Sequence, residues 1–251
     1  MPDWFEQLTF DGYAMLPKAF APSEIAVARR DCAAALADGS AASSVLAGSV
    51  GPAYGARNLL RLWPEVVALL RTATLAASIL RVLGPQAGAV RGLYFDKPPG
   101  NSWALPWHRD LTIAVKEHGP LDLFKKPTIK AGVPHVQAPV GLLATMLSVR
   151  IHLDAVTDRN GPLRVVPGSH APEQAIRMGD REPLVLHCEA GDVLLIRPLL
   201  LHASGHSEPD HRDHRRIVHL ELAPTPHLAD GYEWHDFIQI HSVASAHPAN
   251  C

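Results

Sequence analysis

The stretch Trp107-His108-Arg109-Asp110 places an imidazole and a carboxylate two residues apart. On an extended strand, residues i and i+2 point to the same side, so His108 and Asp110 can converge on one ion while Arg109 points away. With a second imidazole from His202, far downstream, these side chains can hold a metal on one triangular face and leave the opposite face open. This is the two-histidine, one-carboxylate arrangement of non-haem Fe(II) oxygenases. Alone, His-x-Asp is a weak signal, because a surface histidine beside a solvated aspartate gives the same pattern.

The sequence around this stretch predicts extended backbone. Pro106 disfavours a helical turn just before it, and residues 111–115 are rich in strand-forming side chains. Residues 145–154 alternate between apolar side chains and a second face that carries Arg150 and His152. An active site inside a barrel would turn this polar face inward, whereas an open sandwich would turn it to solvent.

The first third of the chain is predicted to be mostly helical. Helical periodicity runs from Ser23 to Gly39, begins again at Pro64, and continues over 75–83. Residues 10–16 indicate a turn and a short strand. Residues 40–55, rich in Gly, Ser and Ala, predict a loop.

The character of the sequence changes near residue 88, where many short strands separated by Gly and Pro turns begin. This pattern is typical of an antiparallel sandwich or jelly roll. Residues 116–140 predict a long irregular loop, and Asn160-Gly161 predicts a hairpin turn. We expect one domain over 1–251, with mostly helical support (1–87), a β core (88–223) and a C-terminal extension (224–251).

Composition excludes several classes of protein. A net charge of −2 over 251 residues, with a pI near 6.7, gives no basic footprint for nucleic acid. The three widely spaced cysteines, Cys32, Cys188 and Cys251, form neither a disulfide framework nor a zinc ribbon, which favours a reducing, cytoplasmic location. There is no signal-peptide pattern and no apolar run long enough to span a bilayer, so we expect no membrane partner. The sequence specifies no oligomeric state.

Four segments in order carry a family resemblance: FDGY at 10–13, WHRD at 107–110, NGPLRVVPGSH at 160–170 and RPLLLHAS at 197–204, followed by Arg215. Together they resemble the phytanoyl-CoA dioxygenase family of Fe(II)/2-oxoglutarate-dependent oxygenases. The resemblance implies a mainly β fold with a double-stranded β-helix core (jelly roll, cupin-like) and N-terminal helices packed on one side. It also implies that His108, Asp110 and His202 are the catalytic iron ligands.

The cosubstrate 2-oxoglutarate needs a cation for its far carboxylate, and arginine supplies a planar bidentate fork. Arg212, Arg215 and Arg216 are the candidates after His202. If the strand pattern places Arg215 with the polar face and Arg216 with the apolar one, Arg215 is the ligand, and Arg216 is the alternative. Ser204 resembles the family's hydroxyl that helps to hold the same carboxylate.

Further polar side chains near these segments are candidate substrate-binding residues. Arg150 and His152, on the predicted inward face, are suited to an anionic group of the substrate or of 2-oxoglutarate. Lys97 and Trp107 lie close in sequence to the metal strand, and Trp107 could wall the pocket. A structural salt bridge for Arg150, and simple packing for the others, are the competing interpretations.

The resemblance implies O2-dependent oxidation of an unactivated C–H bond of a small molecule, with release of succinate and CO2. Asp110 favours hydroxylation, because related halogenases carry a small residue at this position, which leaves room for chloride. Two alternatives stay open: a cupin-like metalloenzyme that does not use 2-oxoglutarate, and a non-catalytic binding protein with a vestigial metal site. The sequence does not specify the substrate, since the site and not the fold sets function.

Overall fold

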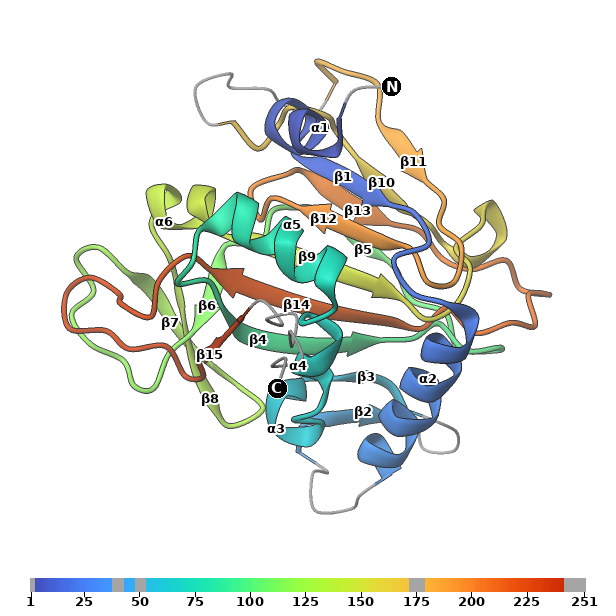
Figure 1. The fold of residues 1–251 in the computed structure, drawn as a ribbon, viewed down its shortest axis with the longest axis horizontal. Helices are drawn as coiled ribbons and strands as arrows, with labels where there is room; N and C mark the ends of the chain where they lie inside the picture. Colours follow the sequence, from blue (N-terminus) through green and yellow to red (C-terminus); the bar gives the residue numbers. More distant parts are fainter. Residues whose placement is uncertain (1–2, 38–42, 48–52, 172–178, 242–251) are drawn as a thin grey trace, which may run out of the picture.

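The computed structural model describes residues 3–37, 43–47, 53–171 and 179–241. In these residues an eight-stranded sheet has the order β1-β12-β9-β14-β4-β3-β2, with β15 also paired to β4 (Figure 1). All of its strand pairs are antiparallel. The strands are β1 (Tyr13–Leu16), β2 (Val45–Ala47), β3 (Ala53–Ala56), β4 (Gly88–Phe95), β9 (Leu147–His152), β12 (Val193–Ile196), β14 (Ile217–Ala223) and β15 (Ile238–Gln239).

Two smaller antiparallel sheets complete the β structure of the described residues. One has the order β11-β10-β13-β5 and the other β6-β8-β7. Their strands are β5 (Leu105–His108), β6 (Thr112–Ala114), β7 (Lys125–Lys130), β8 (Val133–Gln137), β10 (Leu163–Val165), β11 (Leu184–Leu186) and β13 (His202–Ser204). The chain is therefore mainly β.

Helices cover one face of the large sheet (Figure 1). They are α1 (Trp4–Asp11), α2 (Pro22–Ala37), α3 (Leu59–Leu62), α4 (Val66–Leu69) and α5 (Ala73–Leu83), while α6 (Val140–Thr145) precedes β9. Ile25 of α2 and Ile79 of α5 pack in one buried cluster with Val149, Val218 and Leu220 of the sheet. This apolar layer supports the sheet from behind and leaves its other face for polar side chains.

The strand periodicity of β9 and β14 is confirmed. Val149 and Leu220 join the buried cluster beneath the helices, whereas Arg150, His219 and Glu221 line a cavity on the other face. Arg150 and His219 are direct cross-strand partners. The antiparallel pairing thus places the polar residues of both strands side by side.

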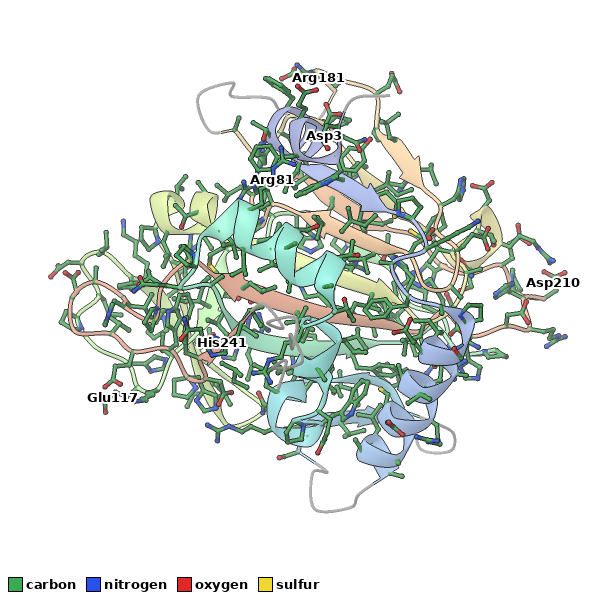
Figure 2. The ribbon with its side chains drawn as sticks, in the orientation of Figure 1. Asp3, Arg81, Glu117, Arg181, Asp210 and His241 are labelled. Atoms are coloured by element: carbon green, nitrogen blue, oxygen red, sulfur yellow. The ribbon has the colours of Figure 1, made fainter. Side chains whose placement is uncertain are left out.

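Helix α1 was not predicted, and it explains why residues 10–16 begin with a turn. Gly12, with φ of 81°, ends α1 in the left-handed conformation that glycine adopts freely, and β1 follows at once. An ion pair of 3.2 Å between Arg81 of α5 and Asp3 fastens the start of α1 to the helical layer (Figure 2).

Three further expectations were wrong. The predicted loop at 40–55 contains β2 and β3, although residues 40–42 and 48–52 of it lie outside the described residues. The predicted loop at 116–140 forms the β7–β8 hairpin. Asn160-Gly161 does form a turn, with Gly161 at φ of 68°, but it links β9 to β10, which lie in different sheets.

The predicted division at residues 87 and 223 stays a prediction, although β4 begins at Gly88 and β14 ends at Ala223. Part of the C-terminal extension is integrated with the fold, since β15 pairs with β4 and Trp234 is buried with Val115 and Phe124. Residues 242–251, including Cys251, lie outside the described residues. Among the helices that the structure describes, none has the length and apolar character that crossing a bilayer requires.

Arg216→Ala is expected to reduce the free energy of unfolding by about 2 kcal/mol, because Arg216 holds the nearly buried Asp154 through charged hydrogen bonds. Its Nε lies 2.7 Å and its Nη2 2.8 Å from the two carboxylate oxygens. Urea unfolding measures the loss. Arg212→Ala, which alters an exposed side chain, is the matched control. Equal stability of the two variants would contradict the structural role of the ion pair.

Candidate functional site

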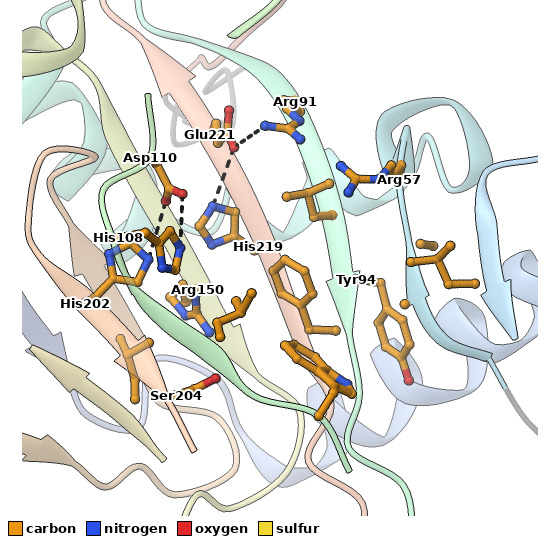
Figure 3. Close-up of a pocket in the computed structure, with 18 of the residues that line it drawn as sticks. Arg57, Arg91, Tyr94, His108, Asp110, Arg150, His202, Ser204, His219 and Glu221 are labelled. Carbon is orange, nitrogen blue, oxygen red and sulfur yellow. Dashed lines mark hydrogen bonds and ion pairs between the residues drawn. The ribbon is translucent and has the colours of Figure 1, made fainter. Parts of the chain in front are cut away.

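The register between β5 and β13 brings the two predicted histidines together, because His202 is the direct cross-strand partner of His108. Asp110 follows β5, and its backbone N–H donates to the carbonyl of Pro198 at 2.9 Å. The two Nε2 atoms each lie 3.8 Å from a carboxylate oxygen of Asp110. One potential ligand atom from each of the three residues lies within 4.8 Å of the others, so the three could share a single ion (Figure 3).

Backbone carbonyls orient both imidazoles. Nδ1 of His108 lies 2.7 Å from the carbonyl oxygen of Pro106, and Nδ1 of His202 lies 2.8 Å from that of Leu200. A carbonyl can only accept, so each Nδ1 carries the proton and each Nε2 is free to bind a metal. Burial lowers the pKa of His202, which favours the neutral form that a metal requires. The donor set and its tautomers therefore fit a divalent ion.

The Asp110 carboxylate is suited to be the anionic ligand. Burial raises the pKa of Asp110, but the imidazoles of His202, His219 and His108 outweigh it and hold the pKa below its usual value. Arg109 points away as predicted, since its Nε donates to the carbonyl of Leu199 at 2.9 Å.

The guanidinium of Arg215 is buried and forms no ion pair among the described residues, although the charge of Asp96 acts on it and Asp96 accepts a hydrogen bond from the Arg215 backbone N–H at 3.2 Å. Its side chain is among the largest fully buried ones, at 1% exposure. Nη1 donates to the carbonyl of Gly161 at 3.0 Å, and Nε has no hydrogen-bond partner in the described structure. Burial and the nearby Arg150 lower the pKa of Arg215 to about 9. Such a group is costly unless an anion joins it.

Lys97, just after β4, lies beside the same carbonyl. Its Nζ is 3.2 Å from the Gly161 oxygen and 3.4 Å from Oγ of Ser204. The Nζ lies 5.0 Å from the ring centre of Trp103, and the guanidinium carbon of Arg215 lies 5.9 Å from it. Burial, with Arg215 and Arg150, lowers the pKa of Lys97 to about 7. Two cations and a hydroxyl thus gather at one end of the site.

A cavity of about 520 Å³ lies between the three sheets. Six predicted residues line it: His108, Asp110, Arg150, His202, Ser204 and Arg215. Arg150 is buried and its Nε has no hydrogen-bond partner in the described structure. The metal triad and the cations Arg150 and Arg215, which form no ion pair in the described structure, therefore line the same cavity.

The other predicted residues do not line this cavity. Lys97 contacts the Ser204 hydroxyl but is not one of the residues that line the cavity. Trp107 packs beside Val166 and Leu201, and His152 is buried with Nδ1 3.2 Å from the carbonyl of Asp192. A substrate-binding role for these three residues stays a prediction.

Several lining residues were not assigned from the sequence. His219 and Glu221 follow Arg215 by four and six residues, so the strand alternation that predicts Arg215 on the polar face could also have assigned them to the site. Arg91 of β4 is the cross-strand partner of Glu221 and forms an ion pair with it at 3.0 Å. No local pattern marked Trp103 or Arg57, which reach the cavity only through the tertiary fold.

Gly161→Ala is expected to destabilise the protein by about 2 kcal/mol or more, because φ of 68° strains a residue that has a Cβ. The added Cβ would also collide with the Gly205 carbonyl and approach Nζ of Lys97 to 2.6 Å. Urea unfolding measures the loss. Gly141→Ala, where nothing lies within 4 Å of the new Cβ, is the control. An unchanged unfolding midpoint for Gly161→Ala would contradict the described turn.

A metal triad of this composition is typical of non-haem Fe(II) oxygenases. The family model described as phytanoyl-CoA dioxygenase (PhyH) matches residues 9–216. The chain belongs to this family.

Solved structures with a similar fold have low sequence identity. EctD from S. alaskensis with bound Fe has a TM-score of 0.67 and 19% identity, covering 87% of this chain and 74% of its own. AviO1 from Streptomyces viridochromogenes Tue57 has a TM-score of 0.61 and 22% identity, covering 88% and 93%. The α-ketoglutarate-dependent carbocyclase SnoK from nogalamycin biosynthesis has a TM-score of 0.62 and 16% identity, covering 92% and 88%. No curated protein matches the sequence.

Proposed function

We propose that this protein is an Fe(II)/2-oxoglutarate-dependent dioxygenase that hydroxylates, or otherwise oxidises, an unactivated C–H bond of a small molecule. The observation that carries the proposal is the buried guanidinium of Arg215, which lacks a carboxylate partner among the described residues and lines the same cavity as the triad. Membership of the family and the similarity to EctD, also solved with 2-oxoglutarate and 5-hydroxyectoine, support it.

His108, Asp110 and His202 would hold the iron. When bound, Fe(II) and 2-oxoglutarate supply the chemistry that activates O2 and releases succinate and CO2. The chain's own contribution is to present two Nε2 atoms whose tautomers the Pro106 and Leu200 carbonyls set and to leave the opposite face open to the cavity.

Arg215 and Ser204 would bind the far carboxylate of 2-oxoglutarate, and the charge of Lys97, which contacts Ser204 from outside the cavity, would add to the attraction. A carboxylate beside Arg215 would supply the charge that this buried group lacks. Because Lys97 has a pKa of about 7, a nearby anion would stabilise its charged form. The position of Lys97 beside Ser204 favours a role in cosubstrate binding over the predicted contact with substrate.

The supporting architecture we propose is a double-stranded β-helix, or jelly roll, in a single domain. The antiparallel sheets on either side of the cavity and the helices on one side support this topology. The polar face of β9 and β14 would then be the barrel interior, which is one of the two placements that the alternation of residues 145–154 left open.

Succinate release tests the function. Protein with Fe(II), 2-oxoglutarate and O2 should form succinate, and the rate should rise when a substrate is present in a small-molecule library. Protein without iron and the Asp110→Ala variant are the controls. Metal-dependent turnover without succinate would favour a cupin-like enzyme, and the absence of any iron-dependent binding or turnover would favour a non-catalytic protein. Either outcome would overturn the proposal.

A further inference from the structure

A second group of cations lines the cavity away from Arg215. Arg57 follows β3, Arg91 lies on β4 and Lys130 ends β7, and all three line the cavity that contains the metal triad. Figure 3 shows the triad on one side of the pocket, Arg57 and Arg91 on the other, and His219 between them. We call Arg57, Arg91 and Lys130 the distal cation cluster.

The charges of this cluster are not balanced within the described structure. Arg91 forms an ion pair of 3.0 Å with Glu221. Lys130 has only the Thr112 hydroxyl, at 3.2 Å from its Nζ, as a side-chain partner. The guanidinium of Arg57 makes no hydrogen bond or ion pair to any residue that the structure describes. Of the carboxylates near the cluster, Glu221 is paired with Arg91, and Asp110, whose charge also acts on Lys130, belongs to the metal triad. Arg57 and Lys130 therefore have no ion-pair partner among the described residues.

The fold holds these like charges together. Asn58, next to Arg57, adopts the left-handed conformation with φ of 56°. Its Nδ2 donates to the carbonyl of Ala131, next to Lys130, at 3.1 Å, and to Oγ of Ser44 at 2.9 Å. The Asn58 amide thus ties the turn of the β7–β8 hairpin to the segment that carries Arg57. The mutual repulsion of Arg57, Arg91 and Lys130 lowers the pKa of Lys130, after burial as the largest cause.

A group of like charges that the fold holds together without enough opposite charge is typical of a binding site for a charged ligand. Apolar side chains, among them Tyr54, Leu93, Phe95 and Leu105, also line this cavity. The cosubstrate does not neutralise the cluster, because Arg215 and Lys97 are at the Ser204 end. A ligand that spans the cavity would need an apolar body and an anionic end.

We infer that the distal cation cluster binds the anionic end, a carboxylate or a phosphate, of a substrate whose apolar body extends toward His108 and His202. This inference rests on the proposed function and specifies the class of substrate that the site accepts. Arg57 and Lys130 would pair directly with the anion, while Arg91, already paired with Glu221, would position it.

Binding without turnover tests the inference. The probes are aliphatic and aromatic carboxylates of about four to ten carbons, sized to the cavity, each paired with its neutral amide and its phosphate monoester. They are titrated calorimetrically, without O2, into protein saturated with Fe(II) and 2-oxoglutarate, so that Arg215 is occupied. We expect at least one carboxylate or phosphate ester to bind about tenfold more tightly than its amide. Comparing the affinity of each carboxylate with that of its phosphate monoester shows which of the two anions the site prefers.

In the double variant Arg57→Met/Lys130→Met this preference should fall to about twofold or less, because the unpaired charges are removed. The double variant Arg30→Met/Arg61→Met removes two cations outside the cavity. This control should keep the wild-type preference for anions. The inference is overturned if the wild-type protein binds no anion more tightly than its amide, and this comparison does not depend on the folding of any variant. It is also overturned if the preference for anions survives in Arg57→Met/Lys130→Met.

The same probes separate this inference from the proposed function. On metal-free Arg215→Ala protein, which lacks the main cosubstrate cation, a preference for anions that is lost when Arg57→Met/Lys130→Met is added reports the distal cluster and not Arg150 or Lys97. A protein that binds no 2-oxoglutarate but keeps this preference would refute the dioxygenase proposal and leave the anion site standing. The reverse result, 2-oxoglutarate binding without any preference for anionic probes, would overturn only the distal site.

Discussion

His202→Ala is expected to weaken Fe(II) binding by at least about 100-fold, because it removes one of three protein ligands, and loss of even an outer hydrogen-bond partner costs about 10-fold to 100-fold. The fold should survive, since the pairing of β13 with β5 and β10 uses backbone groups. Equilibrium dialysis against Fe(II) without O2 measures the metal content, and circular dichroism measures the fold.

His187→Ala is the matched control for the metal prediction. His187 is exposed and pairs with Asp158 at 2.8 Å, outside the cavity, so its loss should leave iron binding unchanged. The same experiment on His108→Ala and Asp110→Ala should reproduce the loss, because the three ligand atoms belong to one site. A folded His202→Ala protein with wild-type iron content would show that the triad is not the metal centre.

The triad and the polar strand faces could be predicted because they depend on strand periodicity. His108 and Asp110 needed only the i, i+2 rule to be placed together. Alternation also placed Arg215 in the cavity and Arg216 on the side of Asp154. A shift of one residue would have exchanged the two arginines, but the apolar residues of β14 leave only one register that buries them.

The β7–β8 hairpin could not be recognised from its residues. Its turn is Ala131-Gly132, in which both residues have positive φ, and alanine gives no signal for that conformation. Pro127 and Pro134 argued against strands at these positions. Pro127 is compatible with a strand because β7 is the edge of its sheet.

Contacts between distant segments account for the remaining differences. Asn160-Gly161 has the sequence of a hairpin turn, but the next strand pairs with β11 and β13 instead of β9. The carbonyl of Gly161 accepts hydrogen bonds from Lys97 and Arg215, which come from 64 and 54 residues away. The hydrogen bond from Asn58 to the carbonyl of Ala131 positions the neighbouring Arg57 at the cavity. Local patterns carry no information about such pairings.

Arg215→Ala is expected to weaken 2-oxoglutarate binding by about 100-fold, because losing the partner of a buried carboxylate costs a few kcal/mol and each 1.4 kcal/mol is a factor of about ten. Lys97 keeps one positive charge near Ser204, so some affinity should remain. Arg215→Lys should rescue only part of the loss, since a point charge cannot replace the guanidinium fork. Titration of iron-loaded protein with 2-oxoglutarate, without O2, measures each affinity.

The neighbouring arginines make this prediction selective. Arg212→Ala alters an exposed side chain and should leave the affinity unchanged. Arg216→Ala should lower stability and not affinity, because Arg216 is held by Asp154 at 2.7 Å and does not line the cavity. A large loss of affinity in Arg216→Ala with none in Arg215→Ala would mean that the strand register is off by one residue. His219 and Glu221 would then also point away from the cavity, and the distal anion site would lose the residues that surround it.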